Sequence, residues 1–251
     1  MRTLLFTSVI AATAFASNEA AANEAPAALF DTVCKHVKQK GDLSSPLQKE
    51  SVATVKAIMA MSEGTDCKAT WSHAKTLKTL DLSGKGITAV AVLRGLDQLT
   101  ELNLSKNEIV DISSLTTLKA LTKLNVSENK IVDITVAAEL PNLVTFNGAK
   151  NQITDVSALS GIAGLQTINL NGNQIDKVFA LSSVKSLQKA SLNQNKIDNL
   201  APLAKNKKLK ELNVKGNPVK NCPDGKKVEV KGKEIENTDL LRGVCKDEAY
   251  K

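Results

Sequence analysis

Asparagine recurs at a constant interval of 22 residues through the middle of the chain, and this repeat limits the fold more than any other feature. The column consists of Asn107, Asn129, Asn151, Asn173, Asn195 and Asn217. Each asparagine is followed two residues later by isoleucine or valine, and apolar residues precede it by eight, five and three positions, Gly148 excepted. The register extends back to Leu77, with Lys85 in the asparagine position. We therefore count about seven repeats, over residues 77–219.

The repeated pattern L-x-x-L-x-L-x-x-N-x-I matches the leucine-rich repeat. The 22-residue period and the D-I-x-x-L segment at residues 111–115 resemble the SDS22-like subclass, which is known from bacterial internalins. With its ends included, the resemblance covers roughly residues 34–245. It implies an α/β fold: a leucine-rich repeat solenoid, or horseshoe, with a parallel sheet on its concave side, a helical N-terminal cap and a small C-terminal cap.

Each position of the repeat has a physical role in such a coil. The L-x-L pair predicts a short strand whose leucines point into the core, while the residues beside them point outward. The segment after the isoleucine predicts short 3₁₀ turns on the convex side. The asparagine amide can both donate and accept hydrogen bonds, so it can satisfy backbone groups inside the bend. We therefore interpret the six asparagines as a structural ladder; the alternative is a row of ligand contacts.

Two large aromatic residues have places in the predicted core. Gly148 lacks a side chain where other repeats have leucine or valine, and the ring of Phe146, two residues earlier, can fill that space. Trp71 lies 22 residues before Leu93, in the leucine position of an incomplete coil. We expect Trp71 to fill the core of the N-terminal cap rather than to serve as an exposed anchor.

Residues 1–16 are typical of a signal peptide. Arg2 precedes an uncharged, mostly apolar run that ends in a small-x-small sequence at Ala16, and a second acceptable cleavage site follows Ala22. The run is too short to span a membrane, and no other stretch is long enough. No lipid-attachment cysteine lies near either site, and the chain has no evident cell-wall sorting motif. These features predict a secreted or periplasmic protein without a membrane span. We also expect the protein to be a monomer.

The boundaries of the segments outside the repeats are placed where the sequence pattern changes. A second helix is expected to begin at Pro46, after Ser45, and to continue to Gly64. Near the C-terminus, an Asn-Pro pair precedes two cysteines and a stretch rich in lysine and glutamate. The predicted boundaries are 17–25 for a linker, 26–76 for the helical N-terminal cap, 77–219 for the repeats and 220–251 for the C-terminal cap and tail.

Four cysteines allow three disulfide pairings. Strands lie about 4.8 Å apart, so seven coils separate the two caps by roughly 30 Å. A disulfide needs Cα atoms within about 7 Å. Only the pairs Cys34–Cys67 and Cys222–Cys245 fit a solenoid of this length. A four-cysteine zinc site fails on the same distance and lacks any C-x-x-C spacing, so no metal or other cofactor is expected.

The outward positions of the strands are the candidate partner-binding residues. They are Glu101, Asn103, Lys123, Asn125, Thr145, Asn147, Thr167, Asn169, Lys189 and Ser191. The face they form is polar, mixed in charge and free of aromatic rings, and a merely solvated sheet face is the alternative interpretation. Horseshoe proteins usually bind through this face, so the resemblance implies a protein ligand there. Polar side chains also suit a glycan or a hydrophilic peptide.

Charge and composition exclude several function classes. The formal net charge is +7, and residues 151–219 carry nine basic and four acidic groups, with a run at Lys205, Lys207, Lys208 and Lys210. This surplus would attract anionic envelope polymers or acidic proteins. Nucleic acid is not expected, because aromatic residues are only 3% of the chain. No group of residues that could form a catalytic site is evident, so we do not expect an enzyme.

The sequence favours an exported protein-binding module. The alternatives are a cell-envelope glycan or anionic-polymer binder and a secreted enzyme inhibitor.

Overall fold

The structure, a computed structural model, describes residues 25–39, 42–61 and 66–220. The predicted signal peptide, most of the linker, and nearly all of the C-terminal cap, with Cys222 and Cys245, lie outside these ranges, so their assignment stays a prediction. Within the described ranges, no helix has both the length and the apolar character needed to cross a membrane.

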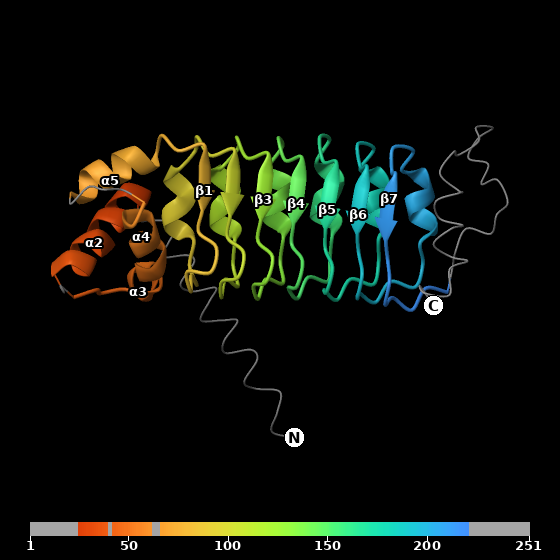
Figure 1. Ribbon diagram of the computed structural model, residues 1–251, viewed down its shortest axis with the longest axis horizontal. Helices are drawn as coiled ribbons and strands as arrows, with labels where there is room; N and C mark the ends of the chain where they lie inside the picture. Colours follow the sequence, from red (N-terminus) through yellow and green to blue (C-terminus); the bar gives the residue numbers. More distant parts are fainter. Residues whose placement is uncertain (1–24, 40–41, 62–65, 221–251) are drawn as a thin grey trace, which may run out of the picture.

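Seven short parallel strands form one sheet in the order of the sequence. They are β1 (Thr79–Asp81), β2 (Glu101–Asn103), β3 (Lys123–Asn125), β4 (Thr145–Asn147), β5 (Thr167–Asn169), β6 (Lys189–Ser191) and β7 (Glu211–Asn213). Each residue pairs with the residue 22 positions later, as Leu102 does with Leu124. The predicted leucine-rich repeat solenoid is confirmed, and its coils follow one another along the longest axis of the molecule (Figure 1).

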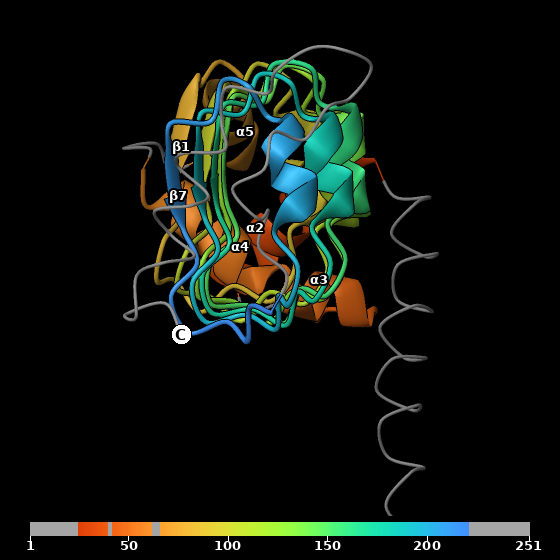
Figure 2. The same cartoon turned by 90° about the vertical axis from the view of Figure 1, so that its right-hand side faces the viewer.

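The opposite side of the solenoid carries one 3₁₀ helix in each of six coils. These are η1 (Ala91–Gly95), η2 (Ser113–Thr117), η3 (Thr135–Glu139), η4 (Ser157–Gly161), η5 (Phe179–Ser183) and η6 (Ala201–Lys205). Figure 2, which looks along the solenoid, shows strands and 3₁₀ helices as two layers. Each of these 3₁₀ helices is a short element of five residues. The sheet opposite them is open and nearly uncurled in Figure 1.

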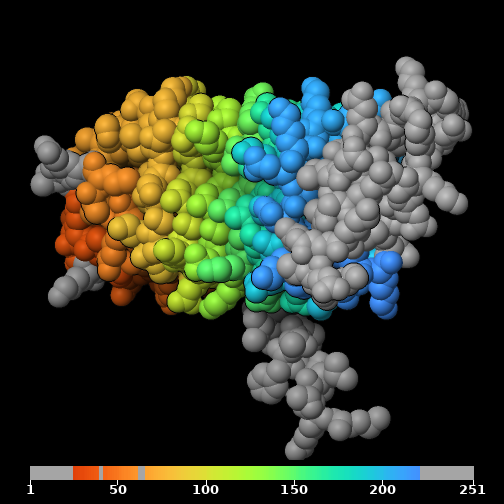
Figure 3. Space-filling view, turned by 45° about the vertical axis from the view of Figure 1, so that its right-hand side comes forward, coloured from red at the N-terminus to blue at the C-terminus, as the bar shows by residue number. Residues whose placement is uncertain are grey.

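The core consists of the apolar residues of the repeat, stacked from coil to coil. Figure 3 shows the coils in this order in space-filling form, from the orange N-terminal cap to the blue last coils. In the second coil, Leu102, Leu104 and Ile109 are all at most 2% exposed. In the fourth coil, a Cβ added at Gly148 would lie 3.1 Å from Cε1 of Phe146 and 3.1 Å from Cδ1 of Ile153. The aromatic ring therefore occupies the space that a side chain at Gly148 would need, as the sequence predicts.

The described residues of the N-terminal cap form four helices: α2 (Pro26–Gln39), α3 (Pro46–Glu50), α4 (Val52–Met59) and α5 (Cys67–Ala74). Ser45 begins α3 with a capping box, in which its Oγ accepts a hydrogen bond from the N–H of Gln48 at 3.2 Å. The single helix expected from Pro46 to Gly64 is divided at Ser51, where φ is −76° and ψ is −8°, and its second part ends at Met59.

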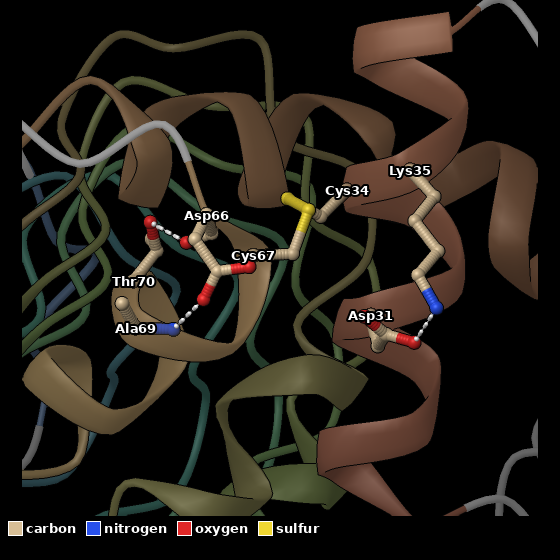
Figure 4. Close-up of a disulfide and its surroundings, with 7 residues drawn as sticks. All are labelled: Asp31, Cys34, Lys35, Asp66, Cys67, Ala69 and Thr70. Carbon is tan, nitrogen blue, oxygen red and sulfur yellow. Dashed lines mark hydrogen bonds and ion pairs between the residues drawn. A yellow bond between two sulfur atoms is a disulfide. The ribbon is translucent and has the colours of Figure 1, made fainter.

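The cap is closed by a disulfide between α2 and α5 and by aromatic packing. Cys34 and Cys67 are bonded, with Cα atoms 5.9 Å apart (Figure 4). Asp66 begins α5 by accepting a hydrogen bond from the N–H of Ala69 at 2.7 Å. Trp71 is 6% exposed, and its ring centroid lies 5.0 Å from that of Phe30. The tryptophan thus fills the cap core, as expected.

Candidate functional site

The asparagines of the ladder use their amides inside the bend of each coil. The Oδ1 of Asn129 accepts a hydrogen bond from the N–H of Ile109 at 3.0 Å, and its Nδ2 donates to the carbonyl of Leu104 at 2.9 Å and of Val126 at 3.0 Å. The other ladder residues repeat these contacts, and all are at most 9% exposed. Buried and hydrogen-bonded in this way, the ladder holds neighbouring coils together and offers nothing to a ligand.

The residue before each ladder asparagine has a left-handed backbone, which the sequence analysis missed. Lys106, Glu128, Lys150 and Gln194 have φ between 54° and 57°, while glycine takes this position in the other coils, with φ of 64° at Gly84, 66° at Gly172 and 76° at Gly216. The sequence did contain a sign of this conformation, since three repeats have glycine at this position and glycine adopts positive φ without steric cost.

Replacing Gly172 with alanine is expected to lower the free energy of unfolding by about 1 kcal/mol, since a Cβ is unfavourable at φ of 66°. Gly161, which has open space around it and an ordinary φ, is the matched control: alanine there should leave stability unchanged or slightly higher. Urea unfolding of both variants measures the difference, and equal effects at the two glycines would contradict this backbone assignment.

The outward side chains of the sheet form a surface that we call the strand face. The first residues of the strands form one column and the third residues another, both in register. In the first column, Nζ of Lys123 lies 2.7 Å from Oε1 of Glu101, and Nζ of Lys189 lies 2.7 Å from Oε1 of Glu211. The two candidate lysines are therefore paired across strands, with Thr145 and Thr167 between the two pairs. Such exposed pairs contribute little stability, so a ligand can replace either partner.

The third residues of β2 to β5 form what we call the outer asparagine column. It consists of Asn103, Asn125, Asn147 and Asn169. In each, Oδ1 accepts a hydrogen bond from the backbone N–H two residues later, at 3.1 to 3.3 Å. The Oδ1 atom of each amide thus stabilises the turn that follows the strand. The Nδ2 atom takes no part in that hydrogen bond and can donate elsewhere.

Aspartate has the same role at the start of the column. Oδ1 of Asp81 accepts from the N–H of Ser83 at 2.9 Å. Hydrogen bonds from the Ser83 side chain and then its backbone lower the pKa of Asp81, and Asn103 lowers it further. An ionised carboxylate can therefore replace the amide at this position without disturbing the turn.

The strand face is hollowed in two places. The smaller hollow, about 430 Å³, extends over the strands from Thr79 to Asn147. The larger hollow, about 630 Å³, lies where the later strands turn. Its lining includes Asn147, Asn169, Asn171, Asn193, Gly172 and Gly216. The hollows bring together most of the candidate residues in two groups, whereas Thr167, Lys189 and Ser191 line neither of them.

The repeat geometry agrees with a comparison of sequence families. The family model described as "Leucine Rich repeats (2 copies)" matches residues 97–142, which contain β2 and β3. The chain thus contains leucine-rich repeats and has the leucine-rich repeat fold. No curated protein gives a significant match to it.

Solved structures show that the leucine-rich repeat fold is internalin-like. An internalin from Listeria monocytogenes is 23% identical, with a TM-score of 0.56, and the match covers 71% of this chain and 61% of that one. Internalin C2 from the same organism is 26% identical, with a TM-score of 0.54 and coverage of 67% and 85%. A leucine-rich repeat protein from Leptospira interrogans is 24% identical, with a TM-score of 0.56 and coverage of 68% and 43%.

The back of the leucine-rich repeat solenoid carries features that the sequence analysis missed or placed only approximately. Phe179, at the start of η5, is 67% exposed, and Nζ of Lys205 lies 5.6 Å from its ring centroid. The other coils have Ala, Ser or Thr at this position, so a phenylalanine there could have been recognised from the sequence as exceptional. In the basic run, Lys207 and Lys208 are exposed beyond η6.

A further hollow, of about 700 Å³, lies where the N-terminal cap meets the first coil, between α4 and the turn that follows β1. Its lining includes Met61 and Asp81.

Metal binding has no candidate in the part of the chain that the structure describes. No group of three or more His, Cys, Asp or Glu side chains is arranged there to hold an ion. His36 lies on α2 and His73 on α5, both within the cap and away from the strand face.

Proposed function

We propose that this protein is an exported, monomeric and non-catalytic module that binds another protein through its strand face. The observation that carries the proposal is the register of the sheet, which aligns hydroxyl, amide and ion-paired side chains over seven strands. A rigid surface of this kind loses little conformational entropy on binding. Export rests on the signal-peptide pattern of residues 1–16.

The strand face offers groups for recognition rather than for chemistry. Its carboxylates at Glu101 and Glu211 are exposed to solvent and paired with lysine. Its amides cannot act as general acids or bases, and its hydroxyls have no histidine beside them among the residues that line the two hollows. The internalin-like fold supports the same proposal, as a scaffold suited to protein binding.

The basic run favours a second candidate, an anionic cell-envelope polymer bound at the back edge of the last coils. Lys205, Lys207, Lys208 and Lys210 are exposed there, and none of them has a carboxylate within salt-bridge distance among the described residues. Unpaired lysines attract polyanions, and added salt weakens such binding.

Charge reversal separates the two candidates in one experiment. Changing Lys123→Glu and Lys189→Glu together should reduce capture of the protein partner from the native organism at least tenfold, because each breaks an ion pair on the strand face and repels the remaining glutamate. The matched control, Lys207→Glu with Lys208→Glu, makes the same change in net charge at the back edge and should leave capture intact. Mass spectrometry of the captured material provides the measurement.

The opposite pattern would refute the proposal. If the Lys207/Lys208 variant loses its target and the Lys123/Lys189 variant retains it, the target binds at the back edge and not at the strand face. Circular dichroism of both variants checks that the fold is unchanged.

A further inference from the structure

The amides in the larger hollow are oriented by the backbone of the solenoid. The Oδ1 of Asn171 accepts a hydrogen bond from the N–H of Asn193 at 2.7 Å, and the Oδ1 of Asn193 accepts from the N–H of Lys215 at 2.7 Å. An amide nitrogen cannot accept these bonds. The oxygen of each side chain must therefore face the next coil, and its NH₂ group must face away from that contact.

The outer asparagine column adds donors of the same kind. Asn147 and Asn169 also line the larger hollow, and their Oδ1 atoms are engaged with the N–H groups of Ala149 and Asn171. In the described part of the chain, no hydrogen-bond acceptor is assigned to Nδ2 of these two residues or of Asn171 and Asn193. Four amide groups in one hollow thus have committed oxygens and free donors.

Lysine increases the donor excess at both ends of the hollow. Lys215 is exposed and has no carboxylate within salt-bridge distance in the described ranges, while Nζ of Lys150 lies 3.4 Å from Oε2 of Glu128. Glu128 is the one carboxylate among the lining residues. The lining therefore has a net positive charge and more donors than acceptors.

Glycine leaves the hollow open at two of its turns. Gly172 and Gly216 take the left-handed position that Lys150 and Gln194 occupy in the neighbouring coils. A Cβ at Gly216 would touch Cγ of Gln194 at 3.4 Å, so a longer side chain would cover this part of the lining. These two turns carry no side chain, and Asn171 and Asn193 beside them are only half-buried.

We infer that the larger hollow binds an acidic segment of the partner protein, an inference that rests on the proposed function of the strand face. An ionised carboxylate has acceptors and no donor, and it can accept from two NH₂ groups at once. Charge-assisted hydrogen bonds of this kind are about twice as strong as neutral ones. The lining contains no aromatic ring on which a sugar could stack, so an acidic peptide fits better than an acidic glycan.

Asparagine-to-aspartate substitutions test the donors without removing the structural acceptors. In the variant with Asn171→Asp and Asn193→Asp, each carboxylate still accepts the backbone N–H of the next coil but has no donor for a ligand. The matched control, Gln152→Glu with Asn199→Asp, makes the same change of charge in residues that line neither hollow of the strand face. Asp155 shows that aspartate supports the turn at the position of Asn199, because both side chains accept a hydrogen bond from the N–H two residues later.

The probe is a synthetic peptide of alternating glutamate and glycine, compared with the same peptide carrying glutamine and with an acidic polysaccharide. Fluorescence anisotropy with the full chain should show binding of the glutamate peptide that is at least tenfold tighter than binding of the glutamine peptide. The Asn171/Asn193 variant should weaken glutamate-peptide binding at least tenfold, and the Gln152/Asn199 variant less than threefold.

Three results would overturn the inference. These are equal affinity for the two peptides, equal losses in the two variants, and binding of the polysaccharide alone. If any of them occurs while the Lys123/Lys189 variant still loses its captured protein, the strand face binds protein but the larger hollow does not select acidic segments. The proposed function would then stand without the inference.

Discussion

Replacing Asn151 with alanine is expected to lower the free energy of unfolding by about 3–4 kcal/mol, because this amide satisfies backbone groups in adjacent coils. Its Oδ1 accepts a hydrogen bond from the N–H of Ile131 at 2.9 Å, and its Nδ2 donates to the carbonyl of Val126 at 2.9 Å. Alanine leaves the Ile131 N–H buried without an acceptor and opens a small cavity beside it. Urea unfolding of the full chain measures the change.

A control for this substitution lies in the same coil. Asn147 belongs to the outer asparagine column, is only half-buried and accepts one backbone hydrogen bond, from Ala149 at 3.2 Å. Alanine at Asn147 should cost less than about 1 kcal/mol. Equal losses in the two variants would contradict the distinction between the buried ladder and the outer column.

Removing the disulfide of the N-terminal cap, by Cys34→Ala with Cys67→Ala, is expected to lower the free energy of unfolding by about 3–4 kcal/mol. The two cysteines are 33 residues apart, and closing a loop of that length restricts the unfolded chain by this amount in the chain-entropy model. Thermal unfolding of the variant and of the unchanged protein, both without reductant, gives the difference.

The loss should be localised, because each coil of a solenoid contacts mainly its neighbours. Hydrogen exchange should show lower protection in α2 and α5, while the amides of β5, several coils away, keep theirs. Unchanged protection in both helices would show that the cap packing of Phe30 and Trp71 suffices without the disulfide.

The repeat allowed the fold to be predicted because each column of the sequence corresponds to one position in space. A residue and the residue 22 positions later are paired in the sheet, as Phe146 and Ile168 are. The buried ladder followed from the chemistry of an amide within a bend. The division of the cap helix at Ser51 was not predicted, because the helical pattern of apolar residues continues through it.

The candidate site could be predicted only in part, since its details depend on contacts between coils. The sequence placed Lys123 and Lys189 on the strand face but did not show that glutamates neutralise both of them. It also placed the outer asparagines among the partner-binding residues without a backbone contact for their oxygens. The structure commits their oxygens to the turns, and at Asn171 and Asn193 the acceptor serves the next coil instead. Each of these contacts joins two adjacent coils, so the repeat pattern within one coil does not reveal it.

Binding through the strand face is tested most directly by site-specific photocrosslinking in the native organism. A photoreactive residue at Thr167, in β5 on the strand face, is compared with one at the exposed Ser157, in η4 on the back of the solenoid. The proposed function predicts a discrete crosslinked protein from position 167 and none from position 157. A crosslinked protein from position 157 alone would contradict it.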